Sequence, residues 1–254
     1  MRPALAFVAG AILLAFMLVL TAPAALLDRR IDALSAGRVR LANATGTLWK
    51  GSGELVLLPG VTRLPVFWRA ELWPLARGEV RAAIGFDPDV PQSAAVVFGS
   101  DRLDVRDLEV SLPVESIVRS ASPALPLAAR GNLALRVERF MQRPDLLDAQ
   151  LSVQWNDASV PAFPPDERIA LGDVRVDLAG RGAVVTGPVR NTGGEVEITG
   201  QVGIAATGTL QLTATLRPRS GDRDRAERIA NALAAIGAPD GQGGYTLSVK
   251  GSWR

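Results

Sequence analysis

The feature that most constrains this chain is a long uncharged stretch near its N-terminal end. No residue between Ala4 and Leu27 carries a charge, and the run from Ala4 to Leu20 is apolar throughout. A helix of about 20 such residues spans the roughly 30 Å hydrocarbon core of a bilayer. A helix packed on a soluble core would instead show polar residues every three or four positions. The sequence therefore predicts a membrane-spanning helix, with everything after it on one side of the membrane.

A cleaved signal peptide is the alternative interpretation of this stretch. The small residues of an A-x-A cleavage site occur at Ala22-Pro23-Ala24. The apolar run is, however, longer than the roughly 7–15 residues of a signal-peptide core, so we expect an uncleaved anchor. Only Met1-Arg2-Pro3 precede the run. We therefore expect the remaining chain to be exported, which in a bacterial topology places it in the periplasm.

A short helix is expected directly after the span, from Pro23 to Ser35. One face of it carries, at helical spacing, the apolar side chains of Leu27, Ile31 and Leu34. We expect this helix to lie at the membrane surface. Residues 1–36 then form the anchor, and residues 37–254 form a periplasmic β-rich domain.

The charge balance restricts the partners of this domain. The chain has 28 basic and 26 acidic residues, which gives a formal net charge of +2. These residues are scattered and interleaved, as on a solvated surface. Nucleic-acid binding requires a clustered basic surface, so nucleic acid is not an expected partner.

Cysteine and histidine are both absent. Their absence excludes disulfides, thiol catalysis, the usual zinc ligands and histidine-dependent triads. An enzyme would have to use carboxylates, or Lys50, Lys250 or Tyr245. Asp87 and Asp89 flank a proline, which indicates a turn and not an acid–base pair. We expect no catalytic, cofactor-binding or metal-binding residues, and a carboxylate-based hydrolase is a minor alternative.

From Val39 onward, apolar residues alternate with polar ones. Such runs recur to the end of the chain and are separated by short Gly- or Pro-marked turns, which indicates antiparallel strands with one apolar face. A change of parity at Asp107 indicates a bulge or a sharp bend. Two short helices are expected near 113–121 and 222–236. The expected fold class is thus mainly β, with an N-terminal transmembrane helix followed by a curved, mostly antiparallel sheet and two short helices.

Two tryptophan-containing elements lie near the start of this domain. The first reads Gly46-Thr47-Leu48-Trp49-Lys50-Gly51, where glycine permits a tight bend and Trp49 is expected to cover exposed backbone. It lacks the spacing of a phosphate-binding loop. The second contains Trp68 and Trp73 and is expected as a strand that ends at Pro74. We interpret both elements as a signature with a structural role, made of Gly46, Thr47, Leu48, Trp49, Gly51, Trp68 and Trp73.

The domain shows signs of an internal duplication. The five residues from Ala44 to Leu48 recur letter for letter from Ala206 to Leu210, and a Pro/Ser-rich break runs from Ser122 to Pro126. These features favour two similar halves that meet near 122–130, although five small residues can also match by chance.

The order of these elements resembles the type II secretion system protein N family, GspN. The resemblance covers nearly the whole chain and rests on the anchor, the Gly46–Gly51 element, the Trp68–Trp73 element, the Gly-rich run Asn191–Gly194 and a late helix followed by a strand. It implies an accessory protein of the machine that exports folded proteins across the outer membrane. That protein is a single-pass inner-membrane protein with a periplasmic body, and its partners are other secretion-system proteins. The resemblance implies no catalytic residues and no cofactor.

A second hypothesis belongs to a different class. A curved antiparallel sheet that is apolar on one face also resembles the AsmA-type proteins, which handle lipid in a groove between the two membranes. The two hypotheses share the anchor and the fold. They differ in whether the apolar face is filled by the protein's own helices or left open to a lipid.

Overall fold

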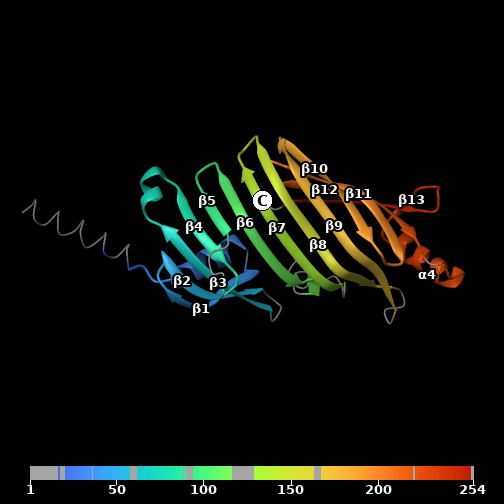
Figure 1. Cartoon of the computed structure of the whole chain (residues 1–254), viewed down its shortest axis with the longest axis horizontal. Coiled ribbons are helices and arrows are strands. Elements are labelled where there is room, and N and C mark those ends of the chain that lie inside the picture. The colour runs from blue at the N-terminus through green and yellow to red at the C-terminus, as the bar shows by residue number, and fades with distance from the viewer. Residues whose placement is uncertain are drawn as a thin grey trace, which may run out of the picture. The chain divides into compact units, whose positions relative to one another are not determined.

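The structure is a computed structural model of the chain. It describes Met17 and residues 21–35, 37–57, 62–87, 89, 94–115, 129–162, 167–219 and 221–252. The chain divides into two compact units, residues 1–93 (unit 1) and 94–254 (unit 2), and most of their strands are labelled in Figure 1. The boundary predicted near 122–130 falls largely outside the described residues.

Unit 1 is an antiparallel sheet accompanied by a helix. Its elements are α2 (Ala25–Leu34), β1 (Val39–Gly46), β2 (Lys50–Leu57), β3 (Thr62–Glu71), the 3-10 helix η1 (Trp73–Arg77) and β4 (Val80–Gly85). The strands lie in chain order, β1-β2-β3-β4, and each pairs antiparallel with the next. Helix α2 confirms the helix predicted after the span. Trp73 begins η1 instead of ending a strand, because Pro74 has no N–H to continue the sheet ladder.

Unit 2 is built from longer antiparallel strands. They are β5 (Ala94–Phe98), β6 (Leu103–Pro113), β7 (Arg130–Gln142), β8 (Leu147–Pro161), β9 (Arg168–Gly182), β10 (Val184–Thr192), β11 (Val196–Ala205) and β12 (Thr209–Pro218), followed by helix α4 (Arg223–Ala234), β13 (Ala238–Pro239) and β14 (Tyr245–Ser252). The strands lie in chain order as far as β12, after which β14 lies between β12 and the short β13. The prediction of a mainly β, antiparallel fold is confirmed.

One of the two short helices predicted in this half can be compared with the structure. Helix α4 confirms the helix predicted near 222–236. The Asp222 carboxylate caps it by accepting hydrogen bonds from the N–H groups of Asp224 and Arg225, as an N-cap residue does. The helix predicted near 113–121 lies mostly outside the described residues, which end at Glu115 in this part of the chain.

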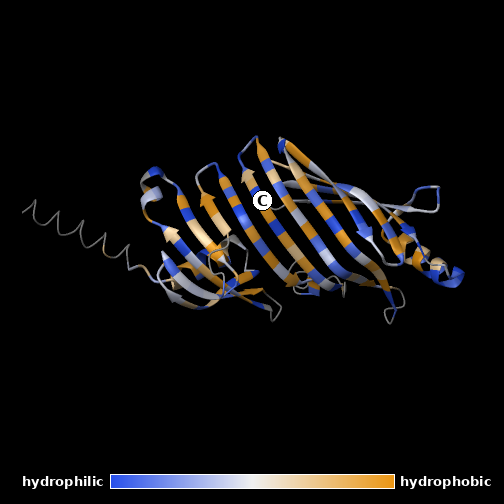
Figure 2. Cartoon of the chain, in the orientation of Figure 1, coloured by the Kyte–Doolittle hydropathy of each residue, from blue (hydrophilic) through white to orange (hydrophobic). Residues whose placement is uncertain are grey.

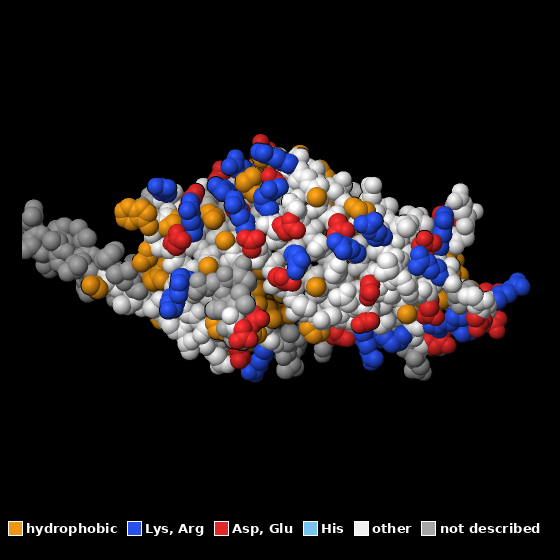
Figure 3. All heavy atoms as spheres, in the orientation of Figure 1, with side chains coloured by type: hydrophobic (Ala, Val, Ile, Leu, Met, Phe, Trp, Pro, Cys, Tyr) orange, Lys and Arg blue, Asp and Glu red, His pale blue; other side chains and the backbone are white. Residues whose placement is uncertain are grey.

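The sheet of unit 2 has one apolar and one polar face. In β10, buried and exposed residues alternate strictly along the strand, because successive side chains of a strand point to opposite faces. Figure 2 shows the same alternation as hydrophobic and hydrophilic bands along the strands. The charged side chains visible in Figure 3 are interleaved, with Lys or Arg next to Asp or Glu, and are not gathered by sign.

Three non-glycine residues with positive φ lie inside strands of the described chain. They are Asn43 in β1, Asp107 in β6 and Asp157 in β8, with φ between 51° and 53°. Asn and Asp tolerate this left-handed region better than other side chains. The pairing register shifts beside Asn43 and beside Asp157, as at a β-bulge. Asp107 has no pairing partner in β7, which confirms the irregularity predicted from the change of parity.

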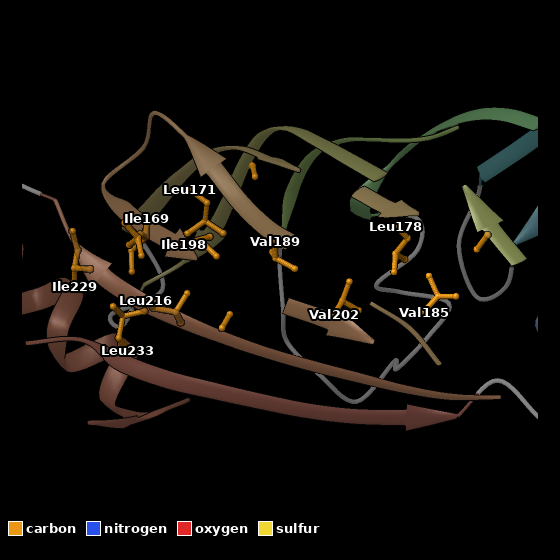
Figure 4. Close-up of a cluster of buried hydrophobic side chains, with 14 of the residues drawn as sticks. Ile169, Leu171, Leu178, Val185, Val189, Ile198, Val202, Leu216, Ile229 and Leu233 are labelled. Atoms are coloured by element: carbon orange, nitrogen blue, oxygen red, sulfur yellow. The ribbon is translucent and has the colours of Figure 1, made fainter. Parts of the chain in front are cut away.

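Each unit has its own hydrophobic core. In unit 1 the buried residues are Ala24, Leu41, Val66 and Trp68. In unit 2 the core lies between the apolar face of β8–β12 and helix α4. Figure 4 shows Ile229 and Leu233 of α4 beside Leu216 of β12, with Ile169, Leu171 and Ile198 close by.

No helix among the described residues is both long enough and apolar enough to cross a membrane. The predicted span, Ala4–Leu27, falls mostly on residues outside the described ranges. It therefore stays a prediction.

Candidate functional site

The Gly46–Gly51 element is a tight hairpin between β1 and β2. The strands pair up to Gly46 and Gly51. The Thr47 N–H donates to the Lys50 carbonyl at 2.8 Å, and the Thr47 Oγ1 accepts from the N–H groups of Trp49 and Lys50, both at 3.2 Å. Gly46 has a φ of 91°, and a Cβ there would lie 2.4 Å from the Lys50 carbonyl oxygen. The turn therefore requires glycine at its first position.

This hairpin binds the segment that follows the apolar run. Pro23 forms a β-bridge with Thr47. The Ala24 N–H donates to the Gly46 carbonyl at 3.2 Å, and the Leu48 N–H donates to the Ala22 carbonyl at 2.9 Å. We call these contacts between Ala22–Ala24 and Gly46–Leu48 the hairpin clamp. Ala24 is buried within it, with 1% of its surface exposed.

Helix α2 continues the attachment on the same sheet. Its Asp28 carboxylate accepts a hydrogen bond from the Leu41 N–H at 2.8 Å. Leu27 and Ile31, which belong to the predicted apolar stripe, pack against the core of unit 1. The sheet therefore covers the helix face that was expected to be apolar.

Trp68 holds the hairpin from the neighbouring strand. It pairs with Gly51 across β2 and β3, and a Cβ on Gly51 would lie 2.4 Å from Cζ2 of the Trp68 ring. The indole N–H of Trp68 donates to the Thr47 carbonyl at 3.1 Å. The Trp68 side chain thus fills the space that glycine leaves and stabilises the turn with its polar atom.

The other two signature tryptophans lie in different surroundings. Trp49 is half-buried and lies in the turn, where its carbonyl accepts a hydrogen bond from the Ala70 N–H at 2.6 Å. Trp73 is 81% exposed. The structure therefore brings Gly46, Thr47, Leu48, Gly51 and Trp68 together around one turn and leaves the Trp73 side chain in solvent.

Unit 2 contains a second candidate site, an apolar cavity of about 490 Å³. Side chains of β8, β9, β10, β11, β12 and β14 line it on the sheet side, and Ala232, Leu233 and Ile236 line it on the α4 side. All of the lining side chains are apolar. Trp155 carries the one polar group among them, and its indole N–H donates to the Arg130 carbonyl at 3.0 Å.

Helix α4 is held over this cavity by an arginine. The Arg225 guanidinium donates to Glu195 at 2.7 and 2.9 Å, to Glu167 at 2.7 Å and to the Arg168 carbonyl at 2.5 Å. The hydrogen bonds from Arg225 lower the pKa of the Glu195 carboxyl, against the opposing effect of burial, and the Ala170 N–H acts in the same direction as Arg225. Arg225 thereby joins helix α4 to the starts of β9 and β11.

The contact between Glu195 and Arg225 predicts that the stability of unit 2 depends on pH. Glu195→Gln should weaken this dependence. The pKa of Glu195 is lower in the folded state than its unfolded value of about 4.3. Its stabilisation is therefore fully present above that value and is lost as the pH falls through the folded pKa. Urea unfolding of the wild type should show this loss of stability as the pH is lowered from 7 to below about 4.3. Glu195→Gln should show a smaller loss.

Glu227→Gln is the matched control for this comparison. Glu227 pairs only with Arg223 in the described chain, and its side chain is 67% exposed. It should leave the acid dependence unchanged. An equal loss of stability in acid for the wild type and Glu195→Gln would contradict the stabilising role given to the contact between Glu195 and Arg225.

A buried carboxylate, Asp104, lies in β6. Asp104 is 2% exposed and pairs with Arg102 at 2.7 Å and Arg106 at 3.1 Å. Burial raises its pKa, but hydrogen bonds from the two arginines outweigh this effect and leave the pKa lowered. The Asp89 N–H donates to the Asp87 carboxylate at 2.8 Å, a contact typical of a turn. No group of three acidic residues in the described part of the chain could hold a metal ion.

These observations define a class of protein, namely a mainly β protein with a clamped N-terminal segment in one unit and an apolar cavity in the other. The family model for "Type II secretion system (T2SS), protein N" matches residues 37–248, and the chain belongs to this family.

Two curated relatives match almost end to end. Type II secretion system protein N of Aeromonas hydrophila is 25% identical over 242 residues, which cover 94% of this chain and 93% of the relative. That of Klebsiella pneumoniae is 27% identical over 243 residues, which cover 94% of this chain and 91% of the relative. No solved structure gives a significant match.

Proposed function

We propose that this protein is a non-catalytic accessory component of the type II secretion system. In this proposal the apolar run near the N-terminus anchors it in the bacterial inner membrane as a single span, and residues 37–254 lie in the periplasm. Membership of the family supports the secretion role. The uncharged stretch from Ala4 to Leu27 supports the anchor.

The observation that carries the proposal is the hairpin clamp. Residues 21–24 separate the apolar run from α2, and three of them contact the hairpin. The connection therefore has no flexible spacer of the Gly/Ser type. An anchor joined in this way would hold unit 1 at the membrane surface, where membrane-embedded subunits of the machine are within reach.

The clamp also favours an anchor that is not cleaved. Cleavage after Ala24 would remove Ala22, Pro23 and Ala24 from the hairpin and would free the carbonyl of Gly46 and the N–H of Leu48. Main-chain groups of this kind are normally paired in folded proteins. Retention of the segment keeps them satisfied.

Absence of catalysis is part of the proposal and rests on composition. The chain has no histidine and no cysteine, so the commonest general base and the commonest strong nucleophile are both missing. We propose that the protein acts by binding other secretion-system proteins.

One edge of the sheet in unit 2 suits such binding. In the described chain, β13 pairs with β14 only at Tyr245 and Thr246, while β12 covers the other edge of β14 along its whole length. The stretch from Leu247 to Gly251 therefore presents main-chain groups at an edge. Such groups can pair with a strand of a partner.

Deletion of the gene should lower the export of an enzyme known to leave the cell by the type II route. The outer-membrane barrier, measured as resistance to a large antibiotic, should stay intact. The full chain should restore export. Residues 21–254 exported behind a cleavable signal peptide should not, because they keep the hairpin clamp and α2 but lack the membrane attachment.

The complementation pair is matched, since both proteins reach the periplasm and differ only in the anchor. Equal restoration by both would contradict the anchoring role. Normal export together with a leaky outer membrane in the deletion strain would contradict the secretion role and favour the AsmA-like hypothesis.

A further inference from the structure

Within the described part of unit 2, side chains leave the apolar cavity partly open. Helix α4 covers part of the sheet, and Ile229 and Leu233 are almost fully buried beneath it. Several lining residues nevertheless stay partly exposed, among them Val174, Val176 and Leu212. Ile236 lines the cavity and is 57% exposed, so the cavity reaches the surface at this residue.

The chemistry of the lining selects the ligand. The lining side chains offer a ligand no hydrogen bond, because the Trp155 N–H is already bonded to the Arg130 carbonyl. A peptide, sugar or nucleotide would bring polar groups into the cavity and leave them unpaired, which is unfavourable. A saturated hydrocarbon chain has no such groups, so it can fill the cavity without leaving a polar group unpaired.

The size and the position of the cavity support the same ligand. Its volume of about 490 Å³ lies within the range of sites for small molecules. The opening at Ile236 leads to solvent, because this residue is 57% exposed. A ligand with a polar end could therefore place its chain inside and its head in water.

We propose that this cavity binds an acyl chain of a membrane phospholipid, with the headgroup outside near Ile236. The choice of an acyl chain as the ligand follows from the apolar lining of the cavity alone. The phospholipid as its source rests on the proposed function, which places the domain at the inner membrane.

A photoreactive lipid tests this site directly. The full chain is reconstituted into vesicles of phosphatidylethanolamine and phosphatidylglycerol that contain a trace of phosphatidylethanolamine with a diazirine on one acyl chain. After irradiation, cross-linked peptides are mapped by mass spectrometry. Label is expected on peptides of β9–β12 and α4, in addition to the N-terminal apolar run, which serves as an internal standard.

A pair of α4 variants provides the contrast. Ala232→Trp places a large ring in the cavity, whereas Ala234→Trp places it on the exposed side of the same helix. Excluding only two methylene groups from an apolar site weakens binding about tenfold. Label on the cavity peptides should therefore fall about tenfold or more in Ala232→Trp and stay at the wild-type level in Ala234→Trp.

Two results would overturn the proposal. One is a wild-type chain labelled on the apolar run but not on the cavity peptides, as expected if another part of the chain fills the cavity. The other is equal cavity label in wild type and Ala232→Trp. If Ala232→Trp fails to fold, Val176→Trp fills the same cavity from β9 and replaces it. The label map does not depend on export, so a negative export experiment leaves this test intact.

Discussion

Trp68→Ala should destabilise unit 1 by about 3–5 kcal/mol, the usual cost of removing a buried tryptophan side chain. The ring is 8% exposed and packs with Leu41 and Val66 in the core. Its loss also leaves the Thr47 carbonyl without the indole N–H. Because the ring lies against Gly51, the turn that forms the hairpin clamp should loosen together with the core.

Urea unfolding gives the loss of stability, and amide hydrogen exchange locates it. Protection should fall at the N–H groups of Ala24 and Leu48, which belong to the clamp. Trp73→Ala is the control. It removes the same side chain from an 81% exposed position and should change stability by less than about 0.5 kcal/mol. Similar losses for the two variants would contradict the role assigned to Trp68.

The second large effect concerns Asn191, which is 8% exposed in β10. Its side-chain amide donates to the carbonyls of Leu171 at 2.5 Å and Val196 at 2.7 Å. Its side-chain carbonyl accepts from the Ile198 N–H at 2.8 Å. One side chain thus joins β9 and β11 to β10 beside the cavity.

Asn191→Ala should destabilise unit 2 by about 3 kcal/mol or more, because each buried polar group left unsatisfied costs about 1–3 kcal/mol. The neighbouring Thr192 points to the exposed side of the same strand, and Thr192→Ala should have a small effect. The comparison is made by chemical unfolding monitored by circular dichroism. Retention of wild-type stability in Asn191→Ala would mean that water replaces the amide at no cost.

The fold was largely predictable because period-2 alternation is a local signal. The strands around Leu135, Leu151 and Val176 follow it, and the change of parity at Asp107 marked the irregular position. Strand β10 was not predicted, because Gly187 and Pro188 interrupt its apolar pattern and both disfavour a strand interior. In the structure Gly187 is required there, since a Cβ would lie 1.8 Å from the Asp177 carbonyl oxygen.

The sites were less predictable for a different reason. The bend at Gly46 followed from residue types. The contact between Trp68 and Gly51 depends on strand register, which the separate elements do not encode. The hairpin clamp is made of main-chain hydrogen bonds between Ala22–Ala24 and the turn, and such bonds leave no residue signature. The cavity arises from where α4 lies on the sheet, which residue spacing alone does not determine.

The hairpin clamp has a mechanical consequence. A flexible linker would transmit only tension, and unit 1 would rotate freely about it. Here the chain that follows the apolar run is attached to a sheet by main-chain hydrogen bonds of Ala24 and Leu48. The hydrogen bond from the Leu41 N–H to the Asp28 carboxylate attaches α2 to β1. In the proposed anchored state, torque as well as tension would pass through such a joint, and a tilt of the apolar run in the bilayer would tilt the sheet of unit 1.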